Sequence, residues 1–240
     1  MRRRIAPMSA PNPYNENRSM LFNHLKRGFV VFIDPLIQHF INRGYHPDTF
    51  TIAGVIFNTI AGVLYAFGFI FEGALVMLFG STTDLIDGQL ARKRNEVSKA
   101  GALLDSTLDR YSESAVLVGL VWYFASIGWT VTAVVAAAAI AGSLMVSYVR
   151  ARAEGLGFEC NVGFMQRPER VIFLAAASVF GEFFSTPNGT VAAALWLLAI
   201  GTHYTTFERM IHVRRKALAE DRERRDADKS EGKAVDTRGS

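Results

Sequence analysis

The chain has 240 residues, and its composition excludes several classes of protein. With 20 Gly, 7 Pro and 1 Cys it is neither collagen-like nor low-complexity, and a lone cysteine forms neither an intramolecular disulfide nor a zinc site. The balance of 26 Lys and Arg against 22 Asp and Glu, with 50% hydrophobic residues, matches a soluble domain with a slight basic excess. That average conceals segments of very different character.

The N-terminal segment is predicted to lie outside the membrane core. Residues 1–18 start with the basic sequence MRRR but lack the apolar core of a signal peptide, and we expect them to be disordered. Residues 19–44 mix large apolar residues with charges, and Pro35 interrupts the pattern. This pattern favours a kinked amphipathic helix in the membrane interface.

The middle of the chain is much more apolar than the whole. A helix that crosses the hydrocarbon of a bilayer needs about 20 mostly apolar residues. Six stretches approach this length, of which the fifth is marginal: 48–70, 72–90, 102–127, 130–149, 171–184 and 190–211. The sequence therefore predicts an all-α, polytopic membrane protein whose catalytic domain, residues 45–213, has six transmembrane helices.

The distribution of cations predicts the orientation of these spans. The turns FIFEG, ASIGWT and EFFSTPNG contain no Lys or Arg. Cations instead collect in 1–47, 91–100, 150–170 and the C-terminal tail. Because cytoplasmic loops are enriched in Lys and Arg, we expect a multi-pass protein of the cell (inner) membrane with both termini and the active site in the cytoplasm.

The C-terminal tail, residues 214–240, carries nine Lys or Arg and seven Asp or Glu, with no aromatic residue. Such a composition buries too little apolar surface to offset the entropy of ordering. The tail is predicted to be disordered.

Four carboxylates interrupt the second and third spans near their cytoplasmic ends: Asp84, Asp87, Asp105 and Asp109. Ionisable residues at such a depth are costly and indicate a functional site. Their spacing places each pair on one helix face, and crowded carboxylates repel one another unless a cation lies between them. Oxygen ligands without His or Cys favour Mg²⁺ or Mn²⁺, and two such ions are a known device for phosphoryl transfer.

Neighbouring residues fit the same chemistry. Gly88 and Gly101 leave room for a phosphate to approach the backbone, and Arg92 offers donors to phosphate oxygens. Taken singly, each has an ordinary alternative, because membrane-helix glycines mostly serve packing and boundary arginines mostly anchor a helix.

Together these residues read Asp84-x2-Asp87-Gly88-x2-Ala91-Arg92-x8-Gly101-x3-Asp105-x3-Asp109. This run resembles the signature of the CDP-alcohol phosphotransferase family, and the resemblance extends over nearly all of the chain. It implies a six-span membrane enzyme, usually a homodimer, that moves a phosphatidyl group from CDP-diacylglycerol to an alcohol and releases CMP. Eight fixed identities at fixed spacing make a chance match very rare.

The resemblance also implies roles for individual residues. Asp84, Asp87, Asp105 and Asp109 would hold two divalent cations, and Asp109 would be the general base. The CDP moiety would contact residues of and around the signature: Asp48, Thr51, Gly88, Arg92, Ser98 and Gly101. For Asp48 an equal alternative is N-terminal capping of the first span. Many relatives have Asp where this chain has Glu113.

The acceptor alcohol is indicated by cations near the fourth and fifth spans. The strings SYVRARAEGLG, QRPER and LDSTLDR resemble the bacterial phosphatidylinositol phosphate synthases of this family, whose acceptor is inositol phosphate. The acceptor phosphate would then be bound by Lys99, Arg152, Arg167 and Arg170. The positive-inside rule alone would explain about half of these cations. Glycerol 3-phosphate is the nearest rival acceptor, because it too needs an anion pocket.

Two other classes of protein share some of these features. A membrane prenyltransferase also uses Asp-rich helix ends and Mg²⁺, but it would lack the register of Gly88, Arg92 and Gly101. A transporter would place its acids near the bilayer midplane rather than at one boundary. No nucleic-acid partner is expected.

Overall fold

The computed structural model describes residues 35, 37–41, 43–94 and 98–236. Within these residues the chain is all-helical, as predicted, and no strand is present. The six main helices are α2 (Pro47–Ala66), α3 (Ile70–Arg94), α4 (Lys99–Ser126), α5 (Thr130–Gly155), α6 (Arg167–Phe183) and α7 (Pro187–Asp236). Each overlaps one of the six apolar stretches, and the predicted order of elements is confirmed.

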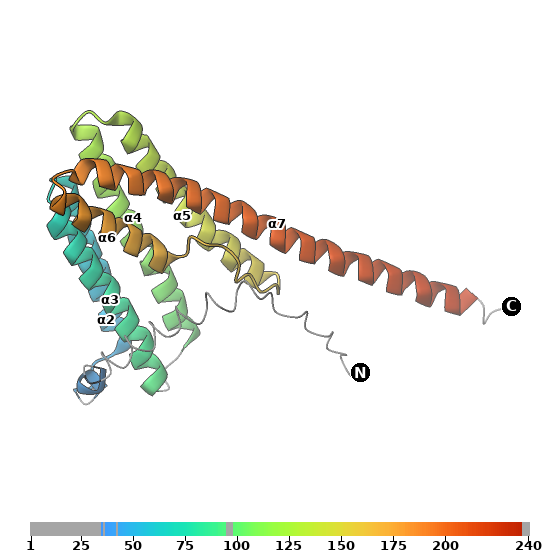
Figure 1. The fold of residues 1–240 in the computed structure, drawn as a ribbon. Helices are drawn as coiled ribbons and strands as arrows, with labels where there is room; N and C mark the ends of the chain where they lie inside the picture. The colour runs from blue at the N-terminus through green and yellow to red at the C-terminus, as the bar shows by residue number, and fades with distance from the viewer. Residues whose placement is uncertain (1–34, 36, 42, 95–97, 237–240) are drawn as a thin grey trace.

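The helices form one bundle in which helices adjacent in sequence run in opposite directions (Figure 1). α2 packs against α3 and α4, α5 packs against α4 and α7, and α6 packs against α3 and α7. The short turns after α2, α4 and α6 lie at one end of the bundle. The ends of α3 and α5 and the starts of α4 and α6 therefore lie on the opposite side of the bundle, toward the carboxylates.

Two of these turns have the same construction. Gly68 and Gly128 have φ values of 84° and 81°, a conformation that favours glycine. In each turn the next residue closes a hydrogen bond to the carbonyl five residues back: Phe69 N to Leu64 O at 3.0 Å, and Trp129 N to Phe124 O at 2.8 Å. This helix-ending motif reverses the chain in three residues.

Small residues set the distance between α2 and α4. A Cβ atom added to Gly119 would lie 1.9 Å from the carbonyl oxygen of Gly62, so the two backbones are in direct contact there. A polar contact ties α2 to α6, because the Tyr65 hydroxyl and Ser178 Oγ lie 2.9 Å apart in the buried core. These contacts fix the helices that carry the site.

The N-terminal segment is described only in part. Residues 37–41 are helical, and the fully buried Ile37 packs with Ile86 and Leu90 at the end of α3. Most of the predicted interfacial helix over 19–44, and all of the predicted disordered residues 1–18, lie outside the described residues.

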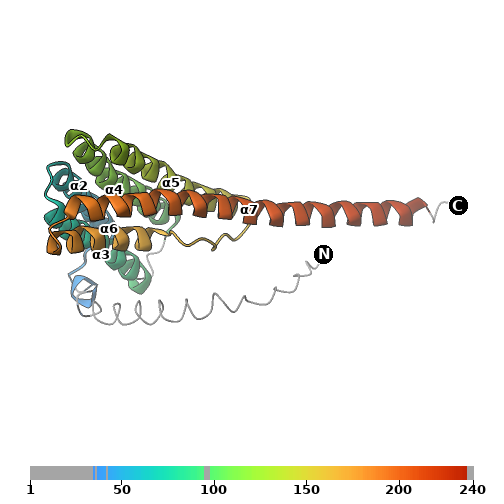
Figure 2. The ribbon, with the colours of Figure 1, turned by 45° about the horizontal axis from the view of Figure 1, so that its top comes forward.

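The C-terminal segment differs from its prediction. The sequence predicted disorder from residue 214, whereas α7 continues as a helix to Asp236 (Figure 2). The reason is local: the segment is rich in Ala, Glu, Arg and Lys, which favour helix, and Arg224 and Glu220 form an i, i+4 ion pair at 3.4 Å. The expectation that it buries little surface agrees with its exposed side chains from residue 219 to residue 226.

By length and composition, two helices of the described chain are apolar enough to cross a membrane, α2 and α5. The remaining helices carry more polar or charged residues. Large apolar side chains are nevertheless exposed on the outside of the bundle, among them Trp122 on α4, Phe180 on α6 and Ile200 on α7. Contiguous exposed apolar surface indicates a non-aqueous environment or a partner.

Candidate active site

The carboxylates of the signature lie about two to three turns before the end of α3 and after the start of α4. Asp84 and Asp87 lie on α3, and Asp105 and Asp109 lie on α4. All four lie within electrostatic range of one another. Asp87 is buried, and the other three are partly buried. The structure thus confirms that the two acidic helix faces come together.

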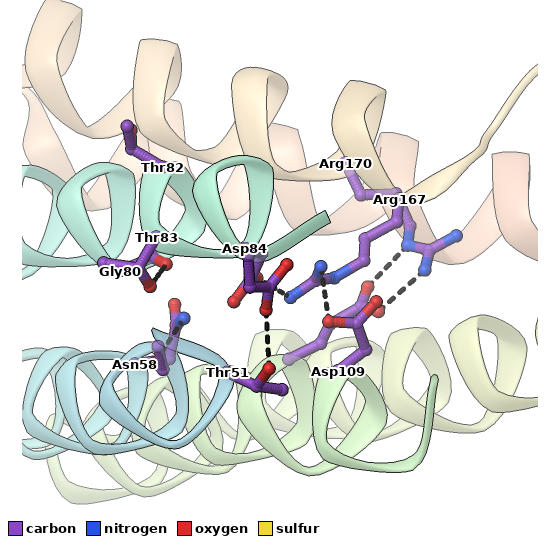
Figure 3. A network of polar contacts seen from close by, with 12 residues as sticks. Thr51, Asn58, Gly80, Thr82, Thr83, Asp84, Asp109, Arg167 and Arg170 are labelled. Carbon is purple, nitrogen blue, oxygen red and sulfur yellow. Dashed lines mark hydrogen bonds and ion pairs between the residues drawn. The ribbon is translucent and has the colours of Figure 1, made fainter. Parts of the chain in front are cut away.

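Arg167, the first residue of α6, lies between the two helices (Figure 3). Its Nη2 donates to Asp84 Oδ2 at 2.7 Å, and its Nη1 is 2.7 Å from Asp109 Oδ1. One guanidinium therefore bridges the acidic faces of α3 and α4. Because arginine stays charged at any ordinary pH, this bridge supplies one positive charge to a cluster of four carboxylates.

Two residues of α2 shape the other side of the cluster. Thr51 Oγ1 donates to Asp87 Oδ2 at 2.7 Å, and both side chains are buried. One turn further along α2, a Cβ atom on Gly54 would lie 2.3 Å from Asp84 Oδ1. Gly54 therefore leaves the space that Asp84 occupies.

The cluster fits a divalent cation by its chemistry. Its donors are carboxylate oxygens, and a single bridging guanidinium leaves an excess of negative charge that attracts further cations. In the described chain, no group of three or more His, Cys, Asp or Glu side chains is already arranged as a set of metal ligands. Arg167 and Thr51 hold three of the four carboxylates in other contacts.

A cavity of about 530 Å³ adjoins the carboxylates and reaches between α4, α5, α6 and α7. Asp105 and Asp109 form part of its wall. Five arginines also line it: Arg110, Arg150, Arg167, Arg170 and Arg209. Such a concentration of guanidinium groups beside a carboxylate cluster is suited to binding a phosphorylated ligand.

The arginines on the walls are held in place by specific partners. Arg170 is 3% exposed and makes a two-pronged ion pair with Glu113, whose Oε2 accepts from Nη2 at 2.7 Å. Arg209 is 2% exposed and donates to two backbone carbonyls. Arg150 pairs with Glu154 at 2.9 Å on the surface of α5.

The proposed nucleotide contacts are spread along the entrance to the carboxylates. Asp48 lies in the first turn of α2 but does not cap it, because His46 is the N-cap and its Nδ1 accepts from Asp48 N at 3.4 Å. Ser98 is the N-cap of α4, and its Oγ accepts from Gly101 N at 3.0 Å. Arg92 is exposed at the end of α3.

Gly88 differs from the glycines used in helix packing. A Cβ atom there would meet Arg92 Nη2 at 3.6 Å, an ordinary contact, so the described structure does not require glycine at this position. The comparable atom on Gly101 would lie 3.1 Å from Ser98 Oγ, which is tight but local. Packing between helices therefore explains neither glycine.

Of the four predicted acceptor residues, Arg167 and Arg170 line the cavity. Lys99 and Arg152 are exposed and do not belong to its lining, and Arg150, two residues before Arg152, faces the cavity instead. Residues two apart on a helix point in nearly opposite directions, so only one of this pair can face the cavity.

Sequence reasoning missed three residues of the site. Arg110 follows the last aspartate of the signature, and Arg209 lies inside the sixth apolar stretch near its end, where an arginine is itself a sign of function. Gly54 belongs to a buried stripe of small and polar residues with Thr51 and Asn58, spaced by three and four along an otherwise apolar helix. That spacing was a usable signal.

Comparison with known proteins identifies the family. Residues 45–207 match the model of the CDP-alcohol phosphatidyltransferase family, which is more than half of the chain. The chain belongs to this family. It is therefore a phosphatidyl-transferring enzyme, and the family predicted from the aspartate signature is confirmed.

Similar proteins with assigned names come from bacteria and archaea. The chain is 36% identical over 189 residues to the phosphatidylinositol phosphate synthase of Mycobacteroides abscessus, covering 78% of this chain and 85% of that protein. It is also 36% identical over 197 residues to the archaetidylinositol phosphate synthase of Methanothermobacter thermautotrophicus, covering 82% and 95%.

Solved structures share the fold. The phosphatidylinositol phosphate synthase of Mycobacterium tuberculosis with CDP-DAG bound has a TM-score of 0.68 and 31% sequence identity, covering 75% of this chain and 92% of that one. The same enzyme in complex with manganese and citrate has a TM-score of 0.67 at 31% identity, covering 75% and 87%.

Proposed function

We propose that the enzyme transfers the phosphatidyl group of CDP-diacylglycerol to inositol phosphate and releases CMP. The observation that carries this proposal is the cavity lined by five arginines directly beside Asp105 and Asp109. An uncharged acceptor such as inositol or serine would have no use for so many guanidinium groups. The names of the similar bacterial and archaeal enzymes support the same acceptor.

We assign two divalent cations, Mg²⁺ or Mn²⁺, to Asp84, Asp87, Asp105 and Asp109. Bound there, such ions would neutralise the diphosphate and stabilise the charge that develops on the attacking and leaving oxygens. The manganese in the similar mycobacterial structure supports this assignment. Thr51 orients Asp87 through its hydrogen bond, and Gly54 makes room for Asp84.

Asp109 is assigned as the general base. Asp109, like Asp105, borders both the acidic cluster and the arginine-lined cavity, so its Oδ atoms can reach an acceptor hydroxyl held in that cavity, and it is the last aspartate of the signature. It would take the proton of this hydroxyl while the oxygen attacks the lipid-side phosphorus and CMP leaves. General-base removal of this kind contributes about 10²- to 10⁴-fold to a rate.

The acceptor phosphate is placed by the arginine side chains. Arg170 already forms a two-pronged ion pair with Glu113, so this pair makes a rigid wall. Arg167 lies between that wall and the carboxylates, and its guanidinium is the one that can turn from Asp84 and Asp109 toward a phosphate. A planar guanidinium binds phosphate oxygens in pairs, which also fixes the orientation of the inositol ring.

The CDP moiety is assigned to the other side of the cluster. Gly88 and Gly101 leave the backbone open there, and Arg92 at the exposed end of α3 is available to the diphosphate. Asp48 and Thr51 at the start of α2 would contact the ribose or cytosine, and Ser98 would contribute through its backbone as well as its capping hydroxyl. Lys99 and Arg152 would attract the anionic acceptor toward the cavity entrance.

The test is CMP release by the purified chain in detergent with Mg²⁺ and CDP-diacylglycerol. Inositol phosphate, glycerol 3-phosphate, inositol and serine are offered in parallel, and we expect turnover with inositol phosphate at least tenfold above the others. Turnover with glycerol 3-phosphate alone would overturn the proposed acceptor. Asp109→Asn should lose about 10²-fold or more, whereas Asp221→Asn, on the exposed part of α7, should be unchanged.

The membrane arrangement is a separate proposal. We infer six spans with both termini and the carboxylates on the cytoplasmic side, an interfacial helix before the first span, and a homodimer. The cation-free turns at one end of the bundle and the exposed apolar side chains on its outside support the spans. In a Cys160→Ser background, an impermeant maleimide applied to intact cells should label Ser126→Cys but not Gly155→Cys. Labelling of Gly155→Cys would reverse the orientation.

A further inference from the structure

We propose that Thr205 and Arg209 of α7 are positioning residues that clamp the loop before α6 and thereby set Arg167 and Arg170. This inference rests on the proposed function for its substrate and deepens it. The family match ends at residue 207, so Arg209 lies beyond the matched region. The two residues are four apart, which places them on the same face of α7.

The clamp is made of three hydrogen bonds. Arg209 donates from Nε to the carbonyl of Val162 at 2.8 Å and from Nη1 to the carbonyl of Val146 at 2.7 Å. Thr205 Oγ1 accepts from the backbone N–H of Met165 at 3.2 Å. These contacts join α7 to α5 and to both ends of the segment 162–165.

The loop is built to receive the clamp. Gly163 has a φ of 107°, and a Cβ atom there would lie 2.4 Å from Thr205 Cγ2 and 3.3 Å from Arg209 Nε. Only glycine therefore allows the loop to lie this close to α7. Met165 and Thr205 are buried, so water cannot replace the hydrogen bonds between them at low cost.

The clamp continues into the site through the backbone of Met165. Its N–H is held by Thr205, and its carbonyl accepts from Arg170 Nη1 at 3.0 Å. The next residue, Gln166, is the N-cap of α6, and Arg167 follows it. A shift of the loop thus moves the start of α6, and with it both arginines, relative to the carboxylates of α3 and α4.

The two hydrogen bonds donated by the Arg209 guanidinium indicate its role. The Arg209 guanidinium is 2% exposed and donates to carbonyls of two separate elements. It therefore fixes the positions of α5 and of the loop before α6 relative to α7. Lysine can donate to one carbonyl but cannot span both, because it lacks the planar fork. The acceptor cavity should therefore lose its shape in stages as the donors are removed, while the CDP side of the site, built on α2, α3 and α4, stays in place.

The experiment compares Arg209→Gln, Arg209→Lys and Thr205→Val with the exposed control Arg214→Gln in the full chain. We expect Arg209→Gln to raise the KM for inositol phosphate about tenfold or more, with the KM for CDP-diacylglycerol and kcat changed by less than about threefold. Arg209→Lys and Thr205→Val should give intermediate increases. Thr205→Val separates positioning from direct binding, because Arg209 itself lines the cavity and Thr205 does not, so an unchanged KM in Thr205→Val would overturn the positioning role. Equal losses in kcat and in both KM values would show general damage and overturn the proposal.

Hydrogen exchange of the amides in 160–166 gives a readout that does not depend on substrate. Exchange should accelerate in Arg209→Gln and Thr205→Val but not in Arg214→Gln, and unchanged exchange would refute the clamp. If the unmodified enzyme turned over none of the offered acceptors, the proposed function would fail. The clamp would still be tested by the exchange data and by the binding of inorganic phosphate. If Arg209→Gln does not fold, Thr205→Val provides the same test.

Discussion

Arg167 and Asp109 are joined by an ion pair in which Nη1 and Oδ1 lie 2.7 Å apart, and the same guanidinium binds Asp84 at 2.7 Å. Arginine thus bridges the two helices whose carboxylates we assign to divalent cations. Two positive groups cannot share the same oxygens without strong repulsion. Arg167 and the cations therefore compete for Asp84 and Asp109.

This competition predicts how Arg167 affects metal affinity. Arg167→Gln removes the competing charge, so the carboxylates should bind Mn²⁺ about tenfold more tightly than in the unmodified protein, a change of about 1.4 kcal/mol. Titration of Mn²⁺ followed by electron paramagnetic resonance measures this directly. Arg214→Gln is the matched control and should leave the affinity unchanged. Weaker Mn²⁺ binding in Arg167→Gln would mean that the arginine supports the metal site instead.

A second prediction concerns Gly54, which gives Asp84 its space. Gly54→Ala would place a carbon 2.3 Å from Asp84 Oδ1, so either the carboxylate or helix α2 must move. We expect CMP release to fall about tenfold or more and the protein to lose about 1–3 kcal/mol of stability. Gly189→Ala is the control, because a Cβ atom there meets nothing within 4 Å. Equal activity of the two variants would refute the role of Gly54.

The buried pair of Arg170 and Glu113 allows structure and binding to be separated. Arg170→Met leaves Glu113 without its partner and should cost about 3–5 kcal/mol of unfolding free energy. Adding Glu113→Leu removes the stranded charge and should restore most of that loss. The double variant should still bind inositol phosphate poorly, because the cavity has lost a guanidinium. Thermal unfolding and the KM for inositol phosphate, measured on the same samples, test the stability prediction and the binding prediction. A KM restored to the unmodified value in the double variant would contradict the binding role of Arg170.

Thr51 is predicted to act through Asp87 rather than through packing. Thr51→Val keeps the shape but removes the donor to Asp87 Oδ2, so the Mg²⁺ concentration for half-maximal CMP release should rise by about threefold to tenfold. Thr51→Ser keeps the hydroxyl and should stay near the unmodified enzyme. Thr59→Val is a control on the same helix, since Thr59 Oγ1 donates only to the carbonyl of Val55 in its own turn. If Thr59→Val also raised the Mg²⁺ concentration for half-maximal CMP release, the effect would reflect the stability of α2 and not the hydrogen bond to Asp87.

Much of the site could be predicted from sequence because its chemistry is carried by a rigid register. The spacing of Asp84, Asp87, Asp105 and Asp109 placed each pair on one helix face, and α2, which packs against both α3 and α4, holds the two faces close to each other. Arg167 and Arg170, which the sequence predicted to act together, both line the cavity beside the carboxylates. These features depend on helix periodicity, which a sequence displays directly.

The remaining features depend on contacts between distant segments, which periodicity does not reveal. Nothing in the sequence indicates that Arg209 reaches Val146 and Val162, or that Gly54 faces Asp84. Likewise, the choice between Arg150 and Arg152 depends on the rotation of α5 about its axis. The helical tail was mispredicted for a different reason, since composition indicates whether a segment can form a core but not whether it stays helical without one.

The continuity of α7 has a mechanical consequence. The helix has 50 residues, about 75 Å at 1.5 Å per residue, and it runs without a break from Pro187 past Thr205 and Arg209 to the charged end that projects from the bundle (Figure 2). An unbroken helix resists twisting, so a torque applied to its projecting end turns the clamp as well. A partner that holds or rotates that end would therefore act, over a distance of several tens of ångströms, on the arginines that we assign to the acceptor.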